Sequence, residues 1–592
     1  MLLTDTIREH VTFALTELYG VAAGSCAFQI NQTRPEFEGD YTVVLFSLVK
    51  SLKKAPDDIA ATLGDFLIRT HPDLYTGHAH IKGFLNLTIA ESFWIGMLER
   101  HYEDSCFGKG DMKRQKVMVE YSSPNTNKPL HLGHLRNNFL GWSIAGILKA
   151  NGYDVIKSCI VNDRGVHICK SMIAWQRYAN GATPESSGMK GDHFVGDFYV
   201  KFNDAYKLEV ESLVASGMEK AVAEKEAPIM KATQVMLQQW EQGEPAVMEL
   251  WRMMNGWVYE GFDVTYKKIG SDFDKTYFES DTYLLGKDAV EDGLQKGVFF
   301  RKADGSVWID LTTDGLDEKI LLRNDGTSVY ITQDIGLAKR KYEEYGIDQS
   351  IYVIGDEQNY HMKVLKLICQ KLELPYADGI HHLSYGMVEL PTGKMKSREG
   401  TVVDADDIVA EMIDIASQHT QALGKVKDIP VEDLGKLYET LGLGALKFFL
   451  LRVDPKKKMI FNPEESIDFH GFTGPFVQYT YARIRSILRK QQPDGHYKLS
   501  PSGLLPLEKD LLVSIEQYGT VLQQAAHELN PSLLAIFAFN LSKTFNSFYA
   551  EHSVASAESE EKRQLRLRIC SLTSTVIRSS LELLGMDVPE RM

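Results

Sequence analysis

The chain has 592 residues, 44% of them hydrophobic and 24% charged, and a formal net charge of −15; it is too long for one hydrophobic core, so several domains are expected. No stretch approaches the roughly 20 apolar residues of a membrane span, and the first residues lack the apolar core of a signal peptide. The six cysteines form no Cys-x-x-Cys pair, which argues against a disulfide framework and a thiolate zinc site and favours a cytoplasmic protein.

Residues 1–112 are predicted to form a separate α/β module. Thr6–Tyr19 has the spacing of an amphipathic helix, and a second helix opens at Pro56, with acidic residues in its first turn. Ile81–Leu87 is predicted as a strand, and the polar stretch Gly108–Arg114 as a linker.

Residues 113–425 alternate strand and helix patterns, which predicts a Rossmann-like parallel sheet. Lys116–Glu120 and Asp154–Val161 are predicted strands, and the apolar residues between them follow helical spacing up to Asn151. A helix-rich segment from about 184 to 310 interrupts the alternation and is interpreted as an insertion. Ligands bind beyond the carboxyl ends of parallel strands, so the loop after Glu120 is the first candidate site.

This first loop runs from Glu120 through Ser-Ser-Pro-Asn125 to His-Leu-Gly-His134. His131 and His134 are spaced i, i+3 at a helix start, where backbone N–H groups and the helix dipole attract anions. Gly133 leaves room for a flat ring near the backbone. A histidine pair without a ligand is the simplest interpretation of these two residues by themselves. The preceding Ser-Pro-Asn and Lys128 favour an ATP site.

A second candidate loop, Gly393-Lys-Met-Lys-Ser-Arg-Glu-Gly400, follows a predicted apolar strand. Lys394 and Lys396 at such a place can neutralise charge that develops on a departing pyrophosphate. The alternative is a solvated basic hairpin, which the pairing with the first loop disfavours.

A pocket for a cationic side chain is predicted from Tyr330 and Asp334, which share one face if a helix begins near Thr332. A buried carboxylate beside an aromatic ring suits a planar guanidinium. The alternative for Asp334 is an ordinary helix N-terminal residue. Gln358, just past the predicted strand Ser350–Gly355, offers an amide at the same sheet edge or simply starts a helix.

Residues 426–592 show helical spacing throughout and are predicted to form an α-helical bundle. Within it, Tyr479 and Tyr481 alternate with Arg483 and Arg485, the combination of stacking and positive charge that holds single-stranded RNA loops. Composition by itself favours a plain bundle helix with core aromatics. The negative net charge argues only weakly against RNA, because local patches decide binding.

Taken together, these motifs resemble arginyl-tRNA synthetases, which are class I aminoacyl-tRNA synthetases, over nearly the whole chain. The matching segments are Gly39-Asp40, Pro56–Ala60, Gly83–Asn86, Glu120–Asn125, His131–His134, Asp325–Tyr330 with Asp334, Val353–Gln358 with His361, Gly471–Tyr479 with Tyr481–Arg483, and Leu583–Met592. The resemblance implies an additional N-terminal domain that contacts the tRNA elbow, a Rossmann-like catalytic domain and an anticodon-binding bundle.

The resemblance also implies the reaction and the residues that carry it. Arginine and ATP would form arginyl-adenylate, which then acylates the terminal adenosine of tRNA(Arg), with Mg²⁺ accompanying ATP, no zinc and no dedicated metal cage. A cytoplasmic monomer is expected. The implied residues are, for catalysis, His131, His134, Lys128, Lys394 and Lys396; for arginine, Glu120, Ser123, Asn125, His134, Tyr330, Asp334 and Gln358; for ATP, His131, Gly133, His134, Lys394, Met395, Lys396 and Ser397; and for tRNA, Phe476, Gln478, Tyr479, Tyr481, Arg483 and Arg485.

One position departs from the class I pattern. The common second signature is Lys-Met-Ser-Lys-Ser, and here Ser397 stands where its second lysine would be. Lys128 is our candidate for the missing charge. Two alternatives remain: a class I enzyme for another substrate, including a small-molecule nucleotidyltransferase, and a catalytically silent RNA-binding paralogue. The first is disfavoured by Asp334 and the bundle, the second by the intact His131 and His134.

Overall fold

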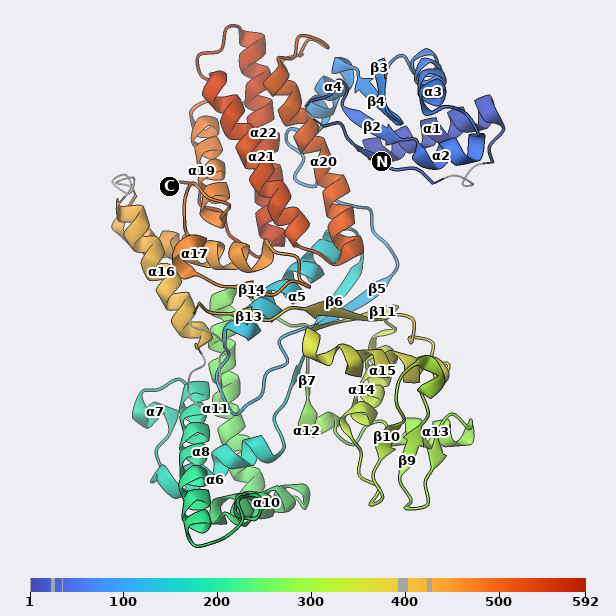
Figure 1. The fold of residues 1–592 in the computed structure, drawn as a ribbon. Helices are drawn as coiled ribbons and strands as arrows, with labels where there is room; N and C mark the ends of the chain where they lie inside the picture. The colour runs from blue at the N-terminus through green and yellow to red at the C-terminus, as the bar shows by residue number, and fades with distance from the viewer. Residues whose placement is uncertain (1, 23–26, 35, 392–402, 423–428) are drawn as a thin grey trace.

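The computed structural model describes residues 2–22, 27–34, 36–391, 403–422 and 429–592. A central sheet has a helical bundle and the N-terminal module above it and two lobes below it (Figure 1). One lobe is helical and the other mixes short strands with helices. Within the described residues, no helix is both long enough and apolar enough to cross a membrane.

The N-terminal module is a four-stranded antiparallel sheet, in the order β1-β2-β4-β3, packed against helices. The single strand predicted over Ile81–Leu87 is wrong. Lys82 and Gly83 have positive φ angles of 48° and 87°, so they form the two-residue turn of a hairpin at this point. The elements are α1 (Leu3–Tyr19), β1 (Ile30–Gln32), β2 (Tyr41–Val44), α2 (Phe46–Leu52), α3 (Pro56–Thr70), β3 (Tyr75–Ile81), β4 (Phe84–Ile89) and α4 (Glu91–His101).

Charged contacts attach this module to the bundle helix α20 (Pro506–Glu528). Asp40, in the turn before β2, pairs with Lys509 at 2.8 Å. The hydroxyl of Tyr41 donates to the buried carboxylate of Glu516. These contacts fix the module on the side of the bundle seen in Figure 1.

The catalytic region is built on five parallel strands in the order β12-β11-β5-β6-β7, which confirms the predicted Rossmann-like class. Chain order reverses between β5 and β11, and ligands of open α/β sheets bind beyond the strand ends at such a switch point. Helix α5 (Leu132–Ala150) follows the first strand, and α14 (Tyr330–Tyr345) and α15 (Asn359–Lys371) flank β11 in sequence. The strands are β5 (Lys116–Glu120), β6 (Asp154–Val161), β7 (Lys275–Phe278), β11 (Gln349–Gly355) and β12 (Ile380–Tyr385).

The segment from 184 to 310 is not one insertion, because β7 lies inside it and pairs with β6 in the main sheet. The helical lobe precedes β7 and the mixed lobe follows it. The strand Lys275–Phe278 is only four residues long and has no clear polar–apolar alternation, so it did not stand out among the helices. The helical lobe consists of α6 (Val166–Tyr178), α7 (Pro184–Ser187), α8 (Gly191–Ala215), α9 (Lys220–Glu226), α10 (Pro228–Glu241) and α11 (Pro245–Ile269). The mixed lobe consists of α12 (Glu279–Thr282), α13 (Lys287–Gln295), β8 (Phe300–Arg301), β9 (Val307–Ile309), η1 (Thr312–Asp314) and β10 (Lys319–Leu322).

The last part of the chain is helical, as predicted, and the loop predicted over Gln491–Leu505 separates two long helices. The predicted domain boundary at 425/426 lies outside the described residues. A short parallel pair of strands, β13 with β14, joins the catalytic region to the bundle. The elements are η2 (Asp356–Gln358), β13 (Val388–Glu389), α16 (Ala405–Ala422), α17 (Val431–Leu451), β14 (Met459–Ile460), α18 (Pro463–Ser466), α19 (Gly474–Lys490), α20, α21 (Ser532–Glu551) and α22 (Glu560–Leu583).

Arg136 on α5 secures the same junction from inside. Its guanidinium is fully buried and donates to the carbonyl oxygens of Gly386, Pro455 and Lys457. A buried charge is tolerated only where hydrogen bonds replace water, so these carbonyls fix α5, and the loop before it, relative to the bundle.

Candidate functional site

A cavity of about 580 Å³ lies beyond the carboxyl ends of β5 and β11, at the switch point of the sheet. Its volume is in the usual range for a small-molecule site, about 300–1,000 Å³. A larger hollow of about 790 Å³ lies between the N-terminal module and α20, and no residue of the first predicted signature loop lines it. The predicted site residues that line the smaller cavity are Glu120, Ser123, His131, Gly133, His134, Tyr330, Asp334 and Gln358.

The loop after β5 enters the cavity through strained backbone. Ser122 and Ser123 have φ angles of 74° and 47°, which cost non-glycine residues on the order of 1–3 kcal/mol each. Buried contacts hold this conformation: the Ser122 amide donates to Asn137 at 2.5 Å, and its hydroxyl lies 2.7 Å from that of Tyr266. The strain turns the chain so that Ser123 faces the cavity.

His131 and His134 cap α5 reciprocally. Nδ1 of His131 accepts from the Gly133 amide, and Nδ1 of His134 accepts from the His131 amide, both at 3.1 Å. Burial lowers the pKa of His131 to about 3 and that of His134 well below its usual value, with smaller contributions from Lys128. Both rings are therefore neutral near pH 7, and because each Nδ1 accepts, each proton is on Nε2.

This arrangement gives the cavity two uncharged, fixed N–H donors beside a helix N-terminus, which suits phosphate oxygens. The two rings lie 4.0 Å apart between centroids. A Cβ at Gly133 would come within 3.0 Å of the His131 ring. A side chain here would therefore crowd the capping histidine, in addition to filling the room for a ligand that the sequence suggested.

Two predicted residues of this loop do not line the cavity. Asn125 is exposed, and its backbone forms a bridge with Asn162 after β6. Lys128 is half-buried, and burial lowers the pKa of its ammonium. Its charge nevertheless contributes to the lowered pKa of both histidines, so it lies within electrostatic reach of them.

On the opposite wall, α14 begins at Tyr330 and carries Asp334 one turn later. The Asp334 carboxylate was expected to be buried, and this is wrong: its side chain is 37% exposed and lies 2.6 Å from Nε2 of His361 on α15. Tyr330 is 72% exposed. Both line the cavity because they lie one turn apart on the same face of a helix whose neighbouring residues Ile331 and Ile335 are buried.

Glu120 lines the floor of the cavity and already has a partner. Its carboxylate accepts a 2.6 Å hydrogen bond from Lys341 on α14, and both side chains are buried. The Lys341 ammonium also lies 4.4 Å from the ring centroid of Tyr352 on β11. Ion pairing with Glu120 and the neighbouring Tyr352 raises the pKa of Lys341 despite burial. The pair therefore ties α14, which carries Tyr330 and Asp334, to the central strand.

A further carboxylate near this wall was missed from the sequence. Glu279 is the first residue of α12, and burial raises its pKa, with nearby Asp163 and Asp334 adding to the effect. Asp163, at the end of β6, accepts from the amide and hydroxyl of Ser280 at 2.9 and 2.7 Å and so holds this helix start. The sequence signal that could have identified Glu279 was its position directly after strand β7, but that strand was not predicted either.

The second predicted loop lies outside the described residues, so Lys394, Met395, Lys396 and Ser397 receive no structural account. The chain is described again from Val403. Asp404 forms an antiparallel bridge with His131, and the Ala405 amide donates to the Leu130 carbonyl at 3.0 Å. Asp404 and Ala405, the first described residues to make contacts after the second loop, therefore lie against the first loop.

The residues predicted to bind RNA divide into buried and accessible sets. Gln478 is fully buried and donates to the carbonyls of Thr440 and Asp587, and Tyr481 is 2% exposed. Direct RNA contact by these two is wrong for this packing, since their side chains hold the bundle together. Arg485 pairs with Glu590 at 2.9 Å at the surface.

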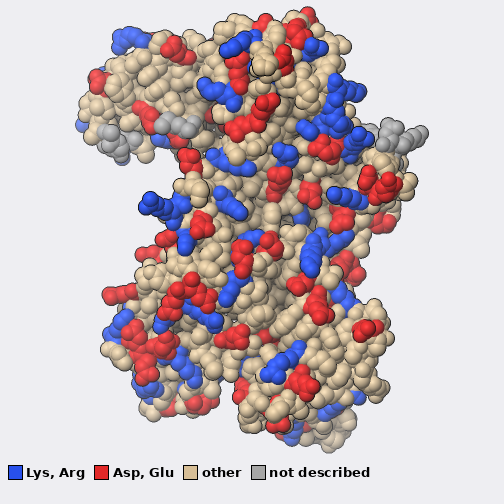
Figure 2. All heavy atoms as spheres, turned by 180° about the vertical axis from the view of Figure 1, so that it is seen from behind, with Lys and Arg blue, Asp and Glu red and all other residues tan. Residues whose placement is uncertain are grey.

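Phe476, Tyr479 and Arg483 instead line a surface hollow of about 360 Å³. The Arg483 guanidinium lies 4.8 Å from the Tyr479 ring centroid and donates to Asn546. Figure 2 shows acidic and basic side chains interspersed over one whole face of the molecule. A stacking ring beside positive charge is the arrangement that accepts an unstacked base.

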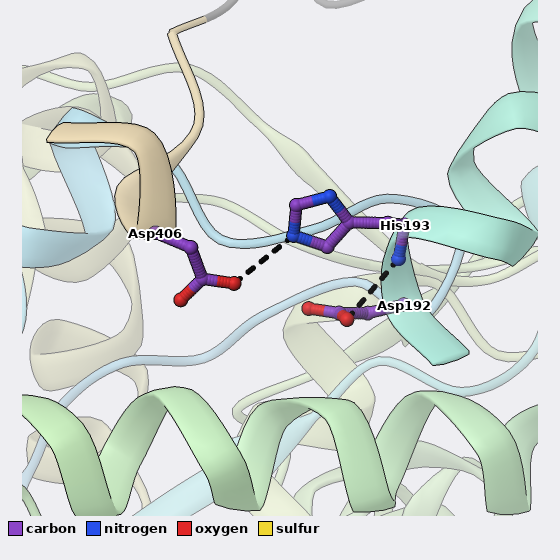
Figure 3. Close-up of side chains that lie close together, drawn as sticks. All are labelled: Asp192, His193 and Asp406. Atoms are coloured by element: carbon purple, nitrogen blue, oxygen red, sulfur yellow. Dashed lines mark hydrogen bonds and ion pairs between the residues drawn. The ribbon is translucent and has the colours of Figure 1, made fainter. Parts of the chain in front are cut away.

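Among the described residues, one group has the spacing of metal ligands: Asp192, His193 and Asp406 (Figure 3). It lies outside the cavity lining. The Lys190 ammonium lies 3.0 Å from Asp192 and 2.6 Å from Asp406. Because this ammonium already compensates the two carboxylates, we do not assign a cation site there.

Comparison with known proteins covers the whole chain. Residues 101–462 match the family model described as "tRNA synthetases class I (R), catalytic domain", residues 477–592 match "DALR anticodon binding domain", and residues 5–89 match "Arginyl tRNA synthetase N terminal domain". Proteins named arginine–tRNA ligase from Parabacteroides distasonis and Bacteroides fragilis are 49% and 50% identical over 100% of both chains. Thermus thermophilus arginyl-tRNA synthetase superposes with a TM-score of 0.82 over 100% of both chains at 25% identity.

Proposed function

The chain belongs to the arginyl-tRNA synthetase family, and from this premise we propose that it is an arginine–tRNA ligase. It activates L-arginine with ATP and attaches the amino acid to the 3′-terminal adenosine of tRNA(Arg), with release of diphosphate and AMP. The observation that carries this proposal is a single cavity with neutral histidine donors on one wall and the Asp334 carboxylate on the other.

On the ATP wall, His131 and His134 present Nε2–H groups whose orientation is set by the Nδ1 bonds of the same rings. Such donors stabilise charge that develops on phosphate oxygens without reorganising during the reaction. The Gly133 position and the α5 N-terminus complete this wall. Magnesium enters as part of the ATP substrate, because Mg²⁺ is commonly held by nucleotide phosphates rather than by a protein cage.

On the arginine wall, Asp334 pairs with the guanidinium and Tyr330 packs beside it. Glu279 lies outside the cavity lining but within electrostatic reach of Asp334. Ser123 and Gln358 hold the α-amino and carboxylate groups. Arginine's carboxylate oxygen then attacks the α-phosphorus, and diphosphate leaves.

Three roles differ from those the resemblance implied. Glu120 acts through Lys341, by fixing α14, rather than by touching arginine. Asn125 contributes through its backbone bridge to Asn162. The positive charge of Lys128 acts electrostatically on the ATP wall, although Lys128 does not line the cavity. Lys394 and Lys396 are retained as the residues that meet the departing diphosphate.

In the second step, the 2′-hydroxyl of the terminal adenosine attacks the carbonyl carbon of the adenylate, and AMP leaves. The bundle places tRNA through Tyr479, Arg483 and Phe476 at the surface hollow, with the N-terminal module contacting another part of the same tRNA. Since positioning supplies much of the rate in such transfers, the protein needs no covalent intermediate.

We also propose a cytoplasmic monomer. The five described cysteines are all free, and four of them are buried, as in a protein kept in a reducing compartment. Light scattering coupled to size exclusion tests the monomer, with a mass near 66.8 kDa expected and twice that value contradicting it.

The function is tested by exchange of labelled pyrophosphate into ATP with each amino acid, with and without tRNA. Exchange with arginine only, dependent on tRNA(Arg), is the expected result. Exchange with another amino acid, or arginine exchange that ignores tRNA, would count against the proposal. Tight tRNA binding without any turnover would favour a silent RNA-binding paralogue.

A further inference from the structure

A charged cluster joins the helical lobe to the start of α16. It consists of Lys190, Asp192 and His193 at the start of α8, Asp404 and Asp406 at the start of α16, and Thr265 on α11. His193 Nε2 lies 3.0 Å from Asp406 (Figure 3). It also lies 3.3 Å from Asp404. Lys190 donates to the same Asp406 oxygen that His193 contacts, and the Thr265 hydroxyl donates to the other, so all three elements meet at Asp406.

The cluster is partly enclosed. Asp192 is fully buried, the Asp404 side chain is 11% exposed, and the His193 and Asp406 side chains are each 30% exposed. Ion pairs at this depth are screened less than surface pairs and hold a defined geometry. The cluster can therefore hold the start of α8 and the start of α16 in a fixed position relative to each other.

The backbone at Asp404 lies directly against the loop that carries His131. Asp404 pairs with His131 in an antiparallel bridge, and the next residue, Ala405, donates its amide to Leu130 at 3.0 Å. The side chain of Asp404 thus faces His193 while its main chain lies against His131. A shift of Asp404 is transmitted to the loop whose first-turn geometry sets the direction of the His131 Nε2–H.

Helix α8 contacts the same loop at a second point. A Cβ at Gly196 would come within 2.8 Å of Pro129 and 3.6 Å of the Lys128 Cα. The helical lobe therefore touches the first loop both through Gly196 and through the charged cluster, three residues apart on one helix.

We propose that His193 is a positioning residue for the ATP half of the reaction, holding Asp404 and Asp406 so that His131 keeps its orientation toward the nucleotide. The proposal rests on the function proposed above and assigns a task to the helical lobe: its α8 start acts as a support for the first signature loop. His193 is not among the described residues that line the cavity.

Ionisation supports this geometry. The hydrogen bond to Asp406, with Asp404 and Asp192 adding attraction and Lys190 and burial opposing it, raises the pKa of His193. Burial raises the pKa of Asp404 to about 6, and hydrogen bonds from His193 and Lys190 lower that of Asp406 despite its burial. The full ion pair therefore exists above about pH 6 and is lost as pH rises through the raised pKa of His193.

The test compares His193→Ala and His193→Gln in steady-state aminoacylation, with calorimetric titration of Mg·ATP as a second readout. Because it removes a charged hydrogen bond, His193→Ala should raise the KM and Kd for ATP roughly 10- to 150-fold and leave the KM for arginine within about twofold. His193→Gln, which keeps a donor at the Nε2 position, should restore most of the ATP affinity. Because glutamine does not titrate, the ATP affinity of this variant should no longer fall as the pH rises through the raised pKa of His193.

His101→Ala is the matched control, because His101 lies 2.9 Å from Asp104 in a His–carboxylate pair far from the cavity. If His193→Ala does not fold, Asp404→Asn, which keeps the acceptor for the Asp406 amide, should still raise the KM for ATP several-fold. Unchanged ATP affinity in His193→Ala, or an equal rise in the KM for ATP and arginine, would overturn the proposal. If the unmodified protein charges no arginine, the proposed function fails, while ATP titration still decides the role of His193.

Discussion

Nε2 of His361 lies 2.6 Å from the Asp334 carboxylate, so the proposed guanidinium acceptor is already paired with a titratable ring before arginine arrives. The hydrogen bond to Asp334 raises the pKa of His361, even though burial opposes it. Arginine and the His361 proton therefore compete for one carboxylate.

This competition predicts that arginine binding releases a proton. At a pH just below the raised pKa of His361, the imidazole of the free protein is protonated. A bound guanidinium takes over the Asp334 carboxylate that stabilises this imidazolium, so the pKa of His361 falls and the proton leaves. Calorimetric titration of arginine in two buffers of different ionisation enthalpy should show the release, and arginine affinity should rise with pH through that pKa. His361→Gln should abolish both effects; a proton release that persists in this variant would contradict the assignment.

Removal of the carboxylate should act on arginine selectively. Asp334→Asn loses a charged hydrogen bond worth about 1.5–3 kcal/mol, so the KM for arginine should rise about 10- to 150-fold while the KM for ATP changes little. Asp317→Asn is the control, because that carboxylate is 82% exposed and outside the cavity. Equal arginine KM values for the Asp334 variant and the parent would exclude Asp334 as the acceptor.

The buried pair of Glu120 and Lys341 should matter more to stability than to substrate contact. Lys341→Met leaves a buried carboxylate unpaired, which costs about 3–5 kcal/mol, so the unfolding midpoint should fall clearly. The double variant Glu120→Gln with Lys341→Met should recover part of that loss. A midpoint for Lys341→Met equal to that of the parent would show that the pair does not secure α14.

Lys128→Ala should slow adenylate formation far more than it weakens arginine binding, because the lysine acts on the ATP wall and not on the arginine wall. Rapid-quench measurement of adenylate in the presence of tRNA separates the two effects. Lys149→Ala, an exposed lysine on α5, is the control. Equal activation rates for the Lys128 variant and the parent would refute the idea that Lys128 replaces the missing signature charge.

On the bundle, Tyr479→Ala should raise the KM for tRNA and leave the KM for arginine unchanged. Stacking of a base is worth about 1–3 kcal/mol, which is about 5- to 150-fold in affinity. Tyr481→Phe, which removes only the hydroxyl bonded to Glu590 at 3.0 Å, should leave the tRNA KM within twofold. If Tyr481→Phe weakened tRNA binding and Tyr479→Ala did not, the division into buried and accessible faces would be wrong.

Much of the fold followed from local patterns. The strand before Glu120, the helix after His131 and the bundle helices all have apolar spacing that a short window reveals. The hairpin turn at Lys82-Gly83 and the brief strand β7 were missed because a few residues of alternation do not distinguish a turn or an edge strand from its neighbours.

The site was predictable where one loop carries it and not where distant segments meet. His131 and His134 are three residues apart and were found together, and Asp334 was found from its spacing to Tyr330. The exposure of Asp334 and the burial of Gln478 depend on packing, which no spacing reveals. His193 and Asp406 are 213 residues apart, so their contact exists only in the folded chain.

The central claim is that this chain attaches arginine, and only arginine, to tRNA. Aminoacylation of total tRNA with each of the twenty amino acids in turn tests it most directly. The account predicts that labelled arginine alone becomes acid-precipitable, in an ATP-dependent reaction that tRNA(Arg) by itself supports. Attachment of a different amino acid, or arginine attachment that does not require ATP, would contradict it.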